Sequence, residues 1–182
     1  MNAFTRRAVL AAPLLTAFAA RAEEKETNTL ILKTVHGETK IKLRPDLAPK
    51  TVAQIKTLVK RKFYDGIVFH RVIPGFMAQT GDPTGTGSGG SELPNIPAEF
   101  SGAHFSRGTV GMARASDPNS ANSQFFICTG DAGFLDKQYT VFGQVVSGMD
   151  VVDKIKAGTK ENNGAVDNPD KIVTLRLASE AK

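Results

Sequence analysis

Short apolar runs that alternate with polar residues dominate the chain from residue 29 onward. Thr29 to Leu43 holds two such runs, TLILKTV and TKIKL, around His36-Gly37-Glu38, which is the pattern of a β-hairpin. The stretch FHRVIPGFMAQTGD, residues 69–82, divides into two strands around Pro74-Gly75. Further strands are expected at 108–114, 123–128 and 140–145.

Two segments have helical rather than alternating spacing. Pro49 to Lys60 carries its apolar residues on one face and predicts an amphipathic helix, and a second short helix is expected at Val151 to Lys156. Lys171 to Ala178 predicts a closing strand, with Ile172 on one face and Val173, Leu175 and Leu177 on the other. Seven or eight short strands with two helices indicate a mainly β domain, a closed antiparallel barrel whose ends the helices cover.

The first 22 residues have the pattern of a secretory signal peptide. A basic start precedes an apolar run at 8–20, and Ala20-Arg21-Ala22 is a cleavage site, with Ala17-Phe18-Ala19 as a second candidate. Residues 5–10, TRRAVL, resemble a twin-arginine signal, although Val9 departs from that pattern; an ordinary export signal is the alternative. We therefore expect a signal at 1–22, a polar tether at 23–28, one folded domain at 29–179 and a periplasmic protein without a stable membrane anchor.

Charge and cysteine content exclude several classes of function. Without residues 1–22, which hold three arginines and no acid, the net charge falls from +5 to +2, so the basic balance gives no argument for nucleic acid. The single cysteine, Cys128, lies in the apolar run QFFICT and is expected to be a small buried side chain. The three histidines have no ligand spacing, so no metal and no other cofactor is expected. Nothing in the chain predicts an obligate dimer, and we expect a monomer.

The Gly-rich segment within 81–97 contains G-x-G-x-x-G, the fingerprint of dinucleotide-binding sites. Such a site requires the motif to leave a strand and to open a helix. Here Pro83 precedes the motif and SELPNIP follows it, so a surface loop is the better interpretation.

An arginine in the middle of the apolar stretch at 69–82 is the strongest sign of chemistry. Strand alternation places Arg71 on one face with Phe69 and Ile73. After the turn, Met77 and Gln79 share a face, and in the later strand Gln124 shares a face with Phe126. Spacing alone also allows a core arginine that extends to the barrel rim.

Four motifs in one order decide between these interpretations: FHRVIPGFMAQTGD, RGTVGMARA, SQFFICT and FLDKQYTVFGQV. Together they resemble the cyclophilin family of peptidyl-prolyl cis-trans isomerases, and especially its short, exported bacterial members. The resemblance extends from about Thr29 to about Ala178. It implies an eight-stranded antiparallel barrel capped by two helices, and a site that needs no cofactor.

The resemblance also implies the roles of individual residues. The catalytic arginine of the family falls on Arg71. The implied proline pocket comprises Phe76, Met77, Phe126 and Leu135. The polar groups that hold the substrate backbone fall on Gln79 and Gln124, and the edge along which the peptide lies falls on Ala113, Arg114 and Ala115.

Three residues depart from the family pattern. Phe134 stands where many members have tryptophan, Tyr139 where many have histidine, and Arg114 where asparagine is frequent. The two aromatic residues keep an aromatic wall for proline. The missing indole N–H predicts weakened binding of cyclosporin, and the charge of Arg114 predicts a preference for acidic neighbours of the proline.

The sequence therefore predicts an isomerase of X-Pro bonds that assists the folding of exported polypeptides, its partners being unfolded or partly folded chains that contain proline. One alternative is a chaperone that uses the same groove and isomerises only incidentally. Another is a barrel that carries a small apolar ligand inside. Against it, five large apolar residues are expected to fill the interior: Phe69, Phe125, Ile127, Val141 and Phe142.

Overall fold

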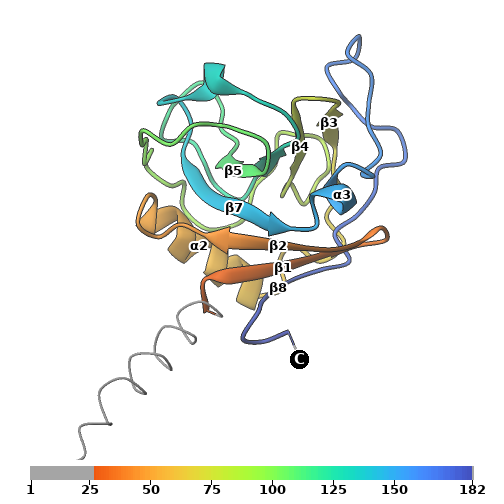
Figure 1. Ribbon diagram of the computed structural model, residues 1–182. Helices are drawn as coiled ribbons and strands as arrows, with labels where there is room; N and C mark the ends of the chain where they lie inside the picture. Colours follow the sequence, from red (N-terminus) through yellow and green to blue (C-terminus); the bar gives the residue numbers. More distant parts are fainter. Residues whose placement is uncertain (1–26, 182) are drawn as a thin grey trace, which may run out of the picture.

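The computed structural model describes residues 27–181 (Figure 1). The predicted signal peptide and the first residues of the tether lie outside these described residues. The strands within them are β1 (Thr29–Thr34), β2 (Gly37–Leu43), β3 (Arg71–Ile73), β4 (Met77–Thr80), β5 (Thr109–Met112), β6 (Phe125–Cys128), β7 (Val141–Ser147) and β8 (Thr174–Leu177). The helices are α2 (Pro49–Lys60), the 3-10 turn η1 (Gly133–Leu135) and α3 (Met149–Val152).

The eight strands form one antiparallel sheet that curls into a half-barrel. Their order is β3-β4-β6-β5-β7-β2-β1-β8, so β3 and β8 are its two edges and do not pair with each other. The predicted mainly β, eight-stranded antiparallel fold is confirmed, but the prediction of a closed barrel is wrong: the barrel is open.

Irregular backbone near the two edge strands explains why the ladder does not close. Residues 66–69, before β3, contact residues 170–172, before β8: Gly66 N–H donates to the Ile172 carbonyl at 2.8 Å, and Phe69 N–H to the Asp170 carbonyl at 2.9 Å. Ile172 and Leu175 are both fully buried whereas Val173 is 51% exposed, so the alternation breaks between them. The predicted faces of Ile172 and Val173 are therefore wrong.

The two helices pack on the sheet at different places. Helix α2 has the predicted bounds, and its apolar face contacts β8. Helix α3 contacts β2; it begins two residues earlier than predicted and ends four residues earlier, at Val152. Ala48 provides no side-chain cap, but the Glu99 carboxylate accepts the N–H groups of Lys50 and Thr51 at 3.0 and 2.8 Å. A distant loop thus satisfies the free donors of the first turn of α2. Within residues 27–181, no helix is long and apolar enough to cross a membrane.

Strand β6 separates two hydrophobic cores, because its side chains alternate between two buried faces. Phe125 and Ile127 belong to the large interior core, whereas Phe126 and Cys128 belong to a small cluster on the other face. Phe69 lies in the interior core, not on the face of Arg71 as alternation predicted, and Val141 lies in the small cluster, not in the interior. The small cluster forms the floor of a cleft on the outer face of the sheet.

Candidate active site

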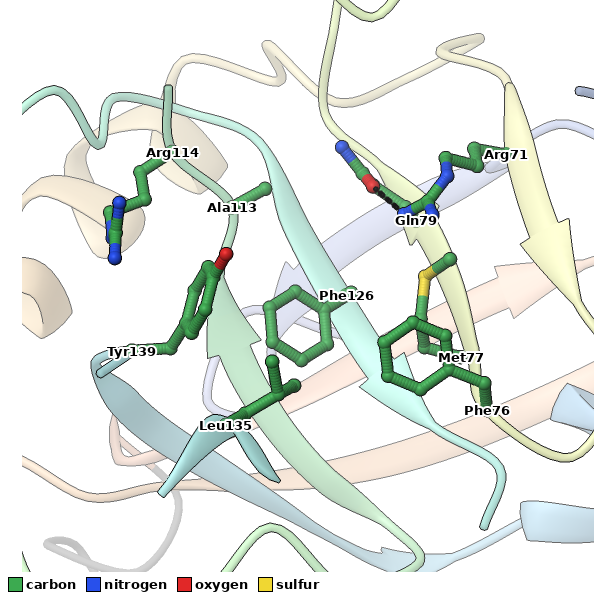
Figure 2. A pocket seen from close by; sticks show the side chains of 9 residues that line it. All are labelled: Arg71, Phe76, Met77, Gln79, Ala113, Arg114, Phe126, Leu135 and Tyr139. Carbon is green, nitrogen blue, oxygen red and sulfur yellow. Dashed lines mark hydrogen bonds between the residues drawn. The ribbon is translucent and has the colours of Figure 1, made fainter. Parts of the chain in front are cut away.

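A shallow cleft of about 130 Å³ opens over the small cluster (Figure 2). Its lining comprises Arg71, Phe76, Met77, Gln79, Ala113, Arg114, Phe126, Leu135 and Tyr139. Pockets for drug-sized ligands occupy roughly 300–1,000 Å³. The cleft is therefore sized for one side chain of a larger molecule.

Strand register places the polar and apolar groups of the cleft side by side. Arg71 on β3 lies opposite Gln79 on β4, and Gln79 lies opposite Phe126 on β6. Ile73 and Met77 form the next pair along the same face. Because cross-strand partners are direct neighbours, this register brings Arg71, Gln79 and Phe126 together.

A directed chain of hydrogen bonds holds the Arg71 guanidinium. Its Nη1 donates to Gln79 Oε1 at 3.3 Å, and Gln79 Nε2 donates to Gln124 Oε1 at 2.9 Å. Gln124 Nε2 donates in turn to the carbonyls of Gly87 and Gly89 at 2.9 and 2.8 Å. Each amide is oriented by the next one, so the direction of the guanidinium is fixed from the Gly-rich loop.

The charge of Arg71 is partly desolvated and is not neutralised. Burial lowers the pKa of Arg71 below its ordinary value, and the nearby Tyr139 acts in the opposite direction. Arginine stays protonated in proteins, so the group is a cation and a donor at neutral pH. Among the described residues, no carboxylate lies within ion-pair distance of it.

Asn163 is a second support of Arg71 that sequence reasoning missed. Arg71 Nε donates to the Asn163 backbone carbonyl, and Nη2 donates to Asn163 Oδ1, both at 2.9 Å. Asn163 has a φ of 57°, the left-handed region that asparagine tolerates. The pair Asn163-Gly164 signals a turn in the sequence, but nothing local indicates that this turn lies against β3, 92 residues away.

We expect Asn163→Gly to lower turnover by about fivefold, which corresponds to about 1 kcal/mol of transition-state stabilisation, and to leave peptide binding unchanged. Glycine tolerates the positive φ and keeps the backbone acceptor of Nε, so only the Oδ1 support is lost. Asn168→Gly is the matched control, since Asn168 is an exposed asparagine with a φ of 49° outside the cleft. A rise in peptide Kd without a change in kcat would show that Asn163 does not position Arg71.

The Gly-rich loop is ordered by one buried carboxylate. Asp82 is 1% exposed; its Oδ1 accepts the Thr84 N–H at 2.7 Å, and its Oδ2 accepts the N–H groups of Gly87 and Gly89 at 2.6 and 3.0 Å. Burial alone would raise the pKa of Asp82, but these hydrogen bonds outweigh it and lower the value to about 2. The loop opens no helix and so lacks the geometry of a dinucleotide site.

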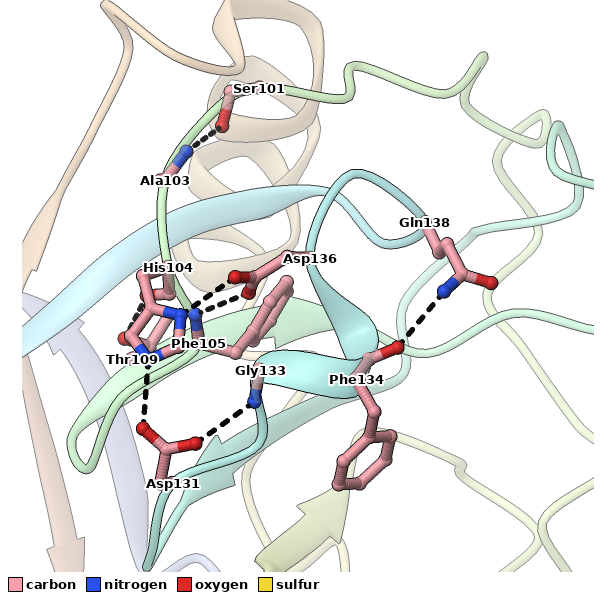
Figure 3. A network of polar contacts seen from close by, with 10 residues as sticks. All are labelled: Ser101, Ala103, His104, Phe105, Thr109, Asp131, Gly133, Phe134, Asp136 and Gln138. Carbon is pink, nitrogen blue, oxygen red and sulfur yellow. Dashed lines mark hydrogen bonds and ion pairs between the residues drawn. The ribbon is translucent and has the colours of Figure 1, made fainter.

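A second polar network holds the turn that carries Leu135 (Figure 3). His104 Nδ1 contacts Asp136 Oδ2 and its Nε2 contacts Asp131 Oδ2, both at 2.7 Å. The same carboxylates accept the backbone N–H groups of Gly133 and Phe105. The two ends of η1 are thereby tied to the segment that precedes β5, which fixes the wall of the cleft.

The stabilisation from His104 should depend on pH in a defined direction. Hydrogen bonds to Asp136 and then Asp131 raise the pKa of His104, so its stabilisation is complete below about pH 6.5 and is lost as pH rises through the raised value. We therefore expect the difference in Tm between the wild-type protein and His104→Gln to be larger at pH 6 than at pH 9. A difference that is equal at both pH values would contradict a charged His104.

Nine of the twelve predicted site residues line the cleft, and the other three lie beside it. The Gln124 side chain contacts the cleft through Gln79, and its backbone carbonyl accepts the Ala113 N–H at 3.0 Å. The exposed Ala115 donates its N–H to Ser120 Oγ. Phe134 is 64% exposed, and its ring lies 5.2 Å from that of Phe76 at the edge of the pocket.

Cys128 lies beneath the cleft but is not a nucleophile. It is fully buried, and burial, together with the Asp131 charge, raises its pKa to about 12. A thiol in that state is inert at neutral pH. In residues 27–181, no group of three or more His, Cys, Asp or Glu side chains could hold a metal ion.

Comparison with known proteins agrees with this geometry. Residues 29–177 match the family model "Cyclophilin type peptidyl-prolyl cis-trans isomerase/CLD". A Brucella suis protein named "Probable peptidyl-prolyl cis-trans isomerase" is 58% identical over 166 residues, which cover 85% of each chain. A Rhizopus delemar peptidyl-prolyl cis-trans isomerase is 39% identical over 87% of this chain and 26% of its own length.

Two solved structures share the fold. A cyclophilin of Hirschia baltica has a TM-score of 0.77 at 26% identity and covers 91% of this chain and 81% of its own. A Cryptosporidium parvum cyclophilin-type isomerase, crystallised in the presence of the dipeptide Ala-Pro, has a TM-score of 0.75 at 27% identity and covers 82% of this chain and 98% of its own. The chain therefore belongs to the cyclophilin-type family of peptidyl-prolyl cis-trans isomerases, and it is an enzyme of that class.

Proposed function

We propose that Arg71 catalyses isomerisation of X-Pro bonds by donating a hydrogen bond to the prolyl nitrogen as the amide twists. The observation that carries this proposal is the unpaired, oriented guanidinium at the rim of an apolar pocket sized for one side chain. In this arrangement the ring of the proline lies against the apolar floor and Arg71 faces its nitrogen.

Elementary amide chemistry explains how a hydrogen-bond donor can catalyse this reaction. The planar amide delocalises the nitrogen lone pair, and this resonance gives the bond a rotational barrier of about 18–20 kcal/mol. In the twisted state the lone pair is localised on nitrogen and becomes a hydrogen-bond acceptor. A donor aimed at that position gains a bond that exists only in the transition state, which is the condition for catalysis.

Arg71 cannot provide the whole acceleration. Shortening a step of tens of seconds to milliseconds requires roughly 5–6 kcal/mol. One charged hydrogen bond contributes about 1.5–3 kcal/mol. We assign the remainder to the floor of Met77, Phe126 and Leu135, which grips the ring while the rest of the peptide rotates and excludes water from the new bond.

The two glutamines have different roles in this proposal. Both N–H groups of Gln124 are engaged by Gly87 and Gly89, so Gln124 acts as a scaffold. Gln79 uses one N–H for Gln124 and accepts from Arg71, which leaves its second N–H for a backbone carbonyl of the substrate. We further propose that Phe134, whose side chain lacks the N–H of a tryptophan indole, weakens cyclosporin binding.

We also propose that the enzyme acts on proline-containing polypeptides outside the cytoplasm, where it assists their folding. The basic and apolar pattern of residues 1–22 supports export, and the adjacent Arg6 and Arg7 support the twin-arginine route. Replacing both by lysine should leave the protein unexported in a cell-fractionation experiment. Unchanged periplasmic recovery would exclude that route.

The activity is tested by NMR exchange spectroscopy on a short peptide with one Xaa-Pro bond. Catalytic amounts of the protein without residues 1–22 should bring the cis–trans exchange of the free peptide into the measurable range. Binding of the peptide without faster exchange would contradict isomerase activity and would favour a recognition module.

A further inference from the structure

Two of the arginines in residues 27–181 lack a carboxylate partner, and both line the cleft. The others form ion pairs: Arg44 with Asp46, Arg61 with Glu92, Arg107 with Asp153 and Arg176 with Asp65. Arg71 and Arg114 have none within that part of the chain. The transition-state role of Arg71 explains one uncompensated cation, but the reaction does not require a second.

Arg114 is held rigidly although it carries no ion pair. Its Nη1 donates to the carbonyls of Ala115 and Ser116 at 2.9 and 3.3 Å, and its Nε and Nη2 donate to the Gln138 carbonyl at 3.3 and 3.1 Å. The guanidinium carbon lies 4.6 Å from the centre of the Tyr139 ring. These contacts satisfy donors and position the group, but they leave its charge uncompensated.

Two acidic residues that lie close in sequence to Arg114 or to its partner Gln138 are engaged elsewhere. Asp117 accepts the Asn119 N–H at 2.8 Å, and Asp136 binds His104. Figure 2 shows Arg71 and Arg114 at opposite ends of the cleft, with Tyr139 and Phe126 between them. A proline held over the floor therefore has one cation facing the reacting bond and another facing the adjoining part of the peptide.

We infer that Arg114, stacked on Tyr139, selects substrates that carry an acidic side chain close to the proline. This inference rests on the proposed isomerase activity and adds a substrate class to it. An exposed charge pair contributes little free energy, so we expect only a roughly 2- to 5-fold preference for an acidic over a neutral peptide. Arg114 therefore biases the choice among substrates and adds little to the affinity for any one of them. The preference should also weaken as salt concentration rises, because exposed charges are screened.

The test compares kcat/KM for peptides that differ only in charge. The series Ala-Xaa-Pro-Phe, Xaa-Ala-Pro-Phe and Ala-Ala-Pro-Xaa carries Glu, Gln or Lys at Xaa. At one or more of the three positions the wild-type protein should favour Glu over Gln by about 2- to 5-fold and should disfavour Lys. The Glu-to-Gln ratio should fall towards one in Arg114→Gln and should be largely kept in Arg114→Lys.

Matched measurements separate this inference from the proposed function. Lys40→Gln removes an exposed positive charge that does not line the cleft, and its ratio should equal that of the wild-type protein. If the wild-type protein accelerates the Gln peptides but shows no preference for Glu at any position, the inference is wrong and the isomerase proposal stands. An equal loss for Glu and Gln peptides in Arg114→Gln would likewise overturn it, because Arg114 would then be only structural. Absence of acceleration for every peptide would contradict the proposed function itself.

Discussion

Replacing Arg71 by alanine should lower kcat by about 10- to 150-fold and change the Kd for peptide by much less. This range corresponds to the loss of one charged hydrogen bond of about 1.5–3 kcal/mol from the transition state. The ground-state peptide should lose little, because its planar prolyl nitrogen is a poor acceptor and its ring is held by the apolar floor. A protease-independent isomerisation assay and a binding titration measure the two quantities separately.

Arg71→Lys is the informative companion of this variant. Lysine keeps the positive charge but lacks the planar fork that contacts Gln79 and Asn163 together. We therefore expect the kcat of Arg71→Lys to lie between the kcat of Arg71→Ala and that of the wild-type protein. Urea unfolding midpoints should confirm that both variants are folded. Losses of similar size in kcat and in peptide affinity would contradict a transition-state role for Arg71.

Asp82→Asn should destabilise the protein by roughly 2–3 kcal/mol and lower its turnover. This destabilisation follows from the pKa of Asp82, which is lowered from 3.8 to about 2, because each unit of pKa corresponds to about 1.4 kcal/mol. Asparagine offers one acceptor where Asp82 uses two, so an NH₂ group would face donors such as the Gly87 N–H. The Gly-rich loop also supplies the carbonyls that orient Gln124, which links its order to the position of Arg71.

The effect of Asp82→Asn should depend on pH with a known sign. Because the folded-state pKa is lowered, the stabilisation is complete above about pH 4 and is lost as pH falls towards 2. Urea unfolding of wild type and variant should therefore differ fully at pH 7 and much less at pH 2.5. Asp117→Asn is the control, because Asp117 is an exposed aspartate whose side chain accepts the Asn119 N–H. Equal differences at both pH values would show that the charge of Asp82 does not hold the loop.

Local pattern was sufficient for much of the fold. Helix α2 has the predicted bounds because helical spacing, an initial proline and a buried face agree within twelve residues. The pairing of Arg71 with Gln79 also follows from alternation around a short turn.

Features that depend on distant parts of the chain could not be predicted in this way. The open seam arises from irregular segments far apart in sequence, such as those around Gly66 and Ile172. Asn163 supports Arg71 because the turn before Gly164 lies along β3, where the Val72 N–H donates to the Gly164 carbonyl at 2.8 Å. The motif FHRVIPGFMAQTGD ends at Asp82, but the carboxylate orders the Gly-rich loop only because that loop folds back on it. Such contacts are set by tertiary packing, which local periodicity does not encode.

The most direct test of the central claim is the cis–trans exchange rate of a peptide while it is bound. Line shapes recorded for an Xaa-Pro peptide at saturating wild-type protein and at saturating Arg71→Ala give this rate at equal occupancy. The proposed role of Arg71 predicts bound exchange at least about tenfold slower in the variant, with both proteins fully occupied. Equal bound exchange in the two proteins would show that Arg71 does not stabilise the twisted amide.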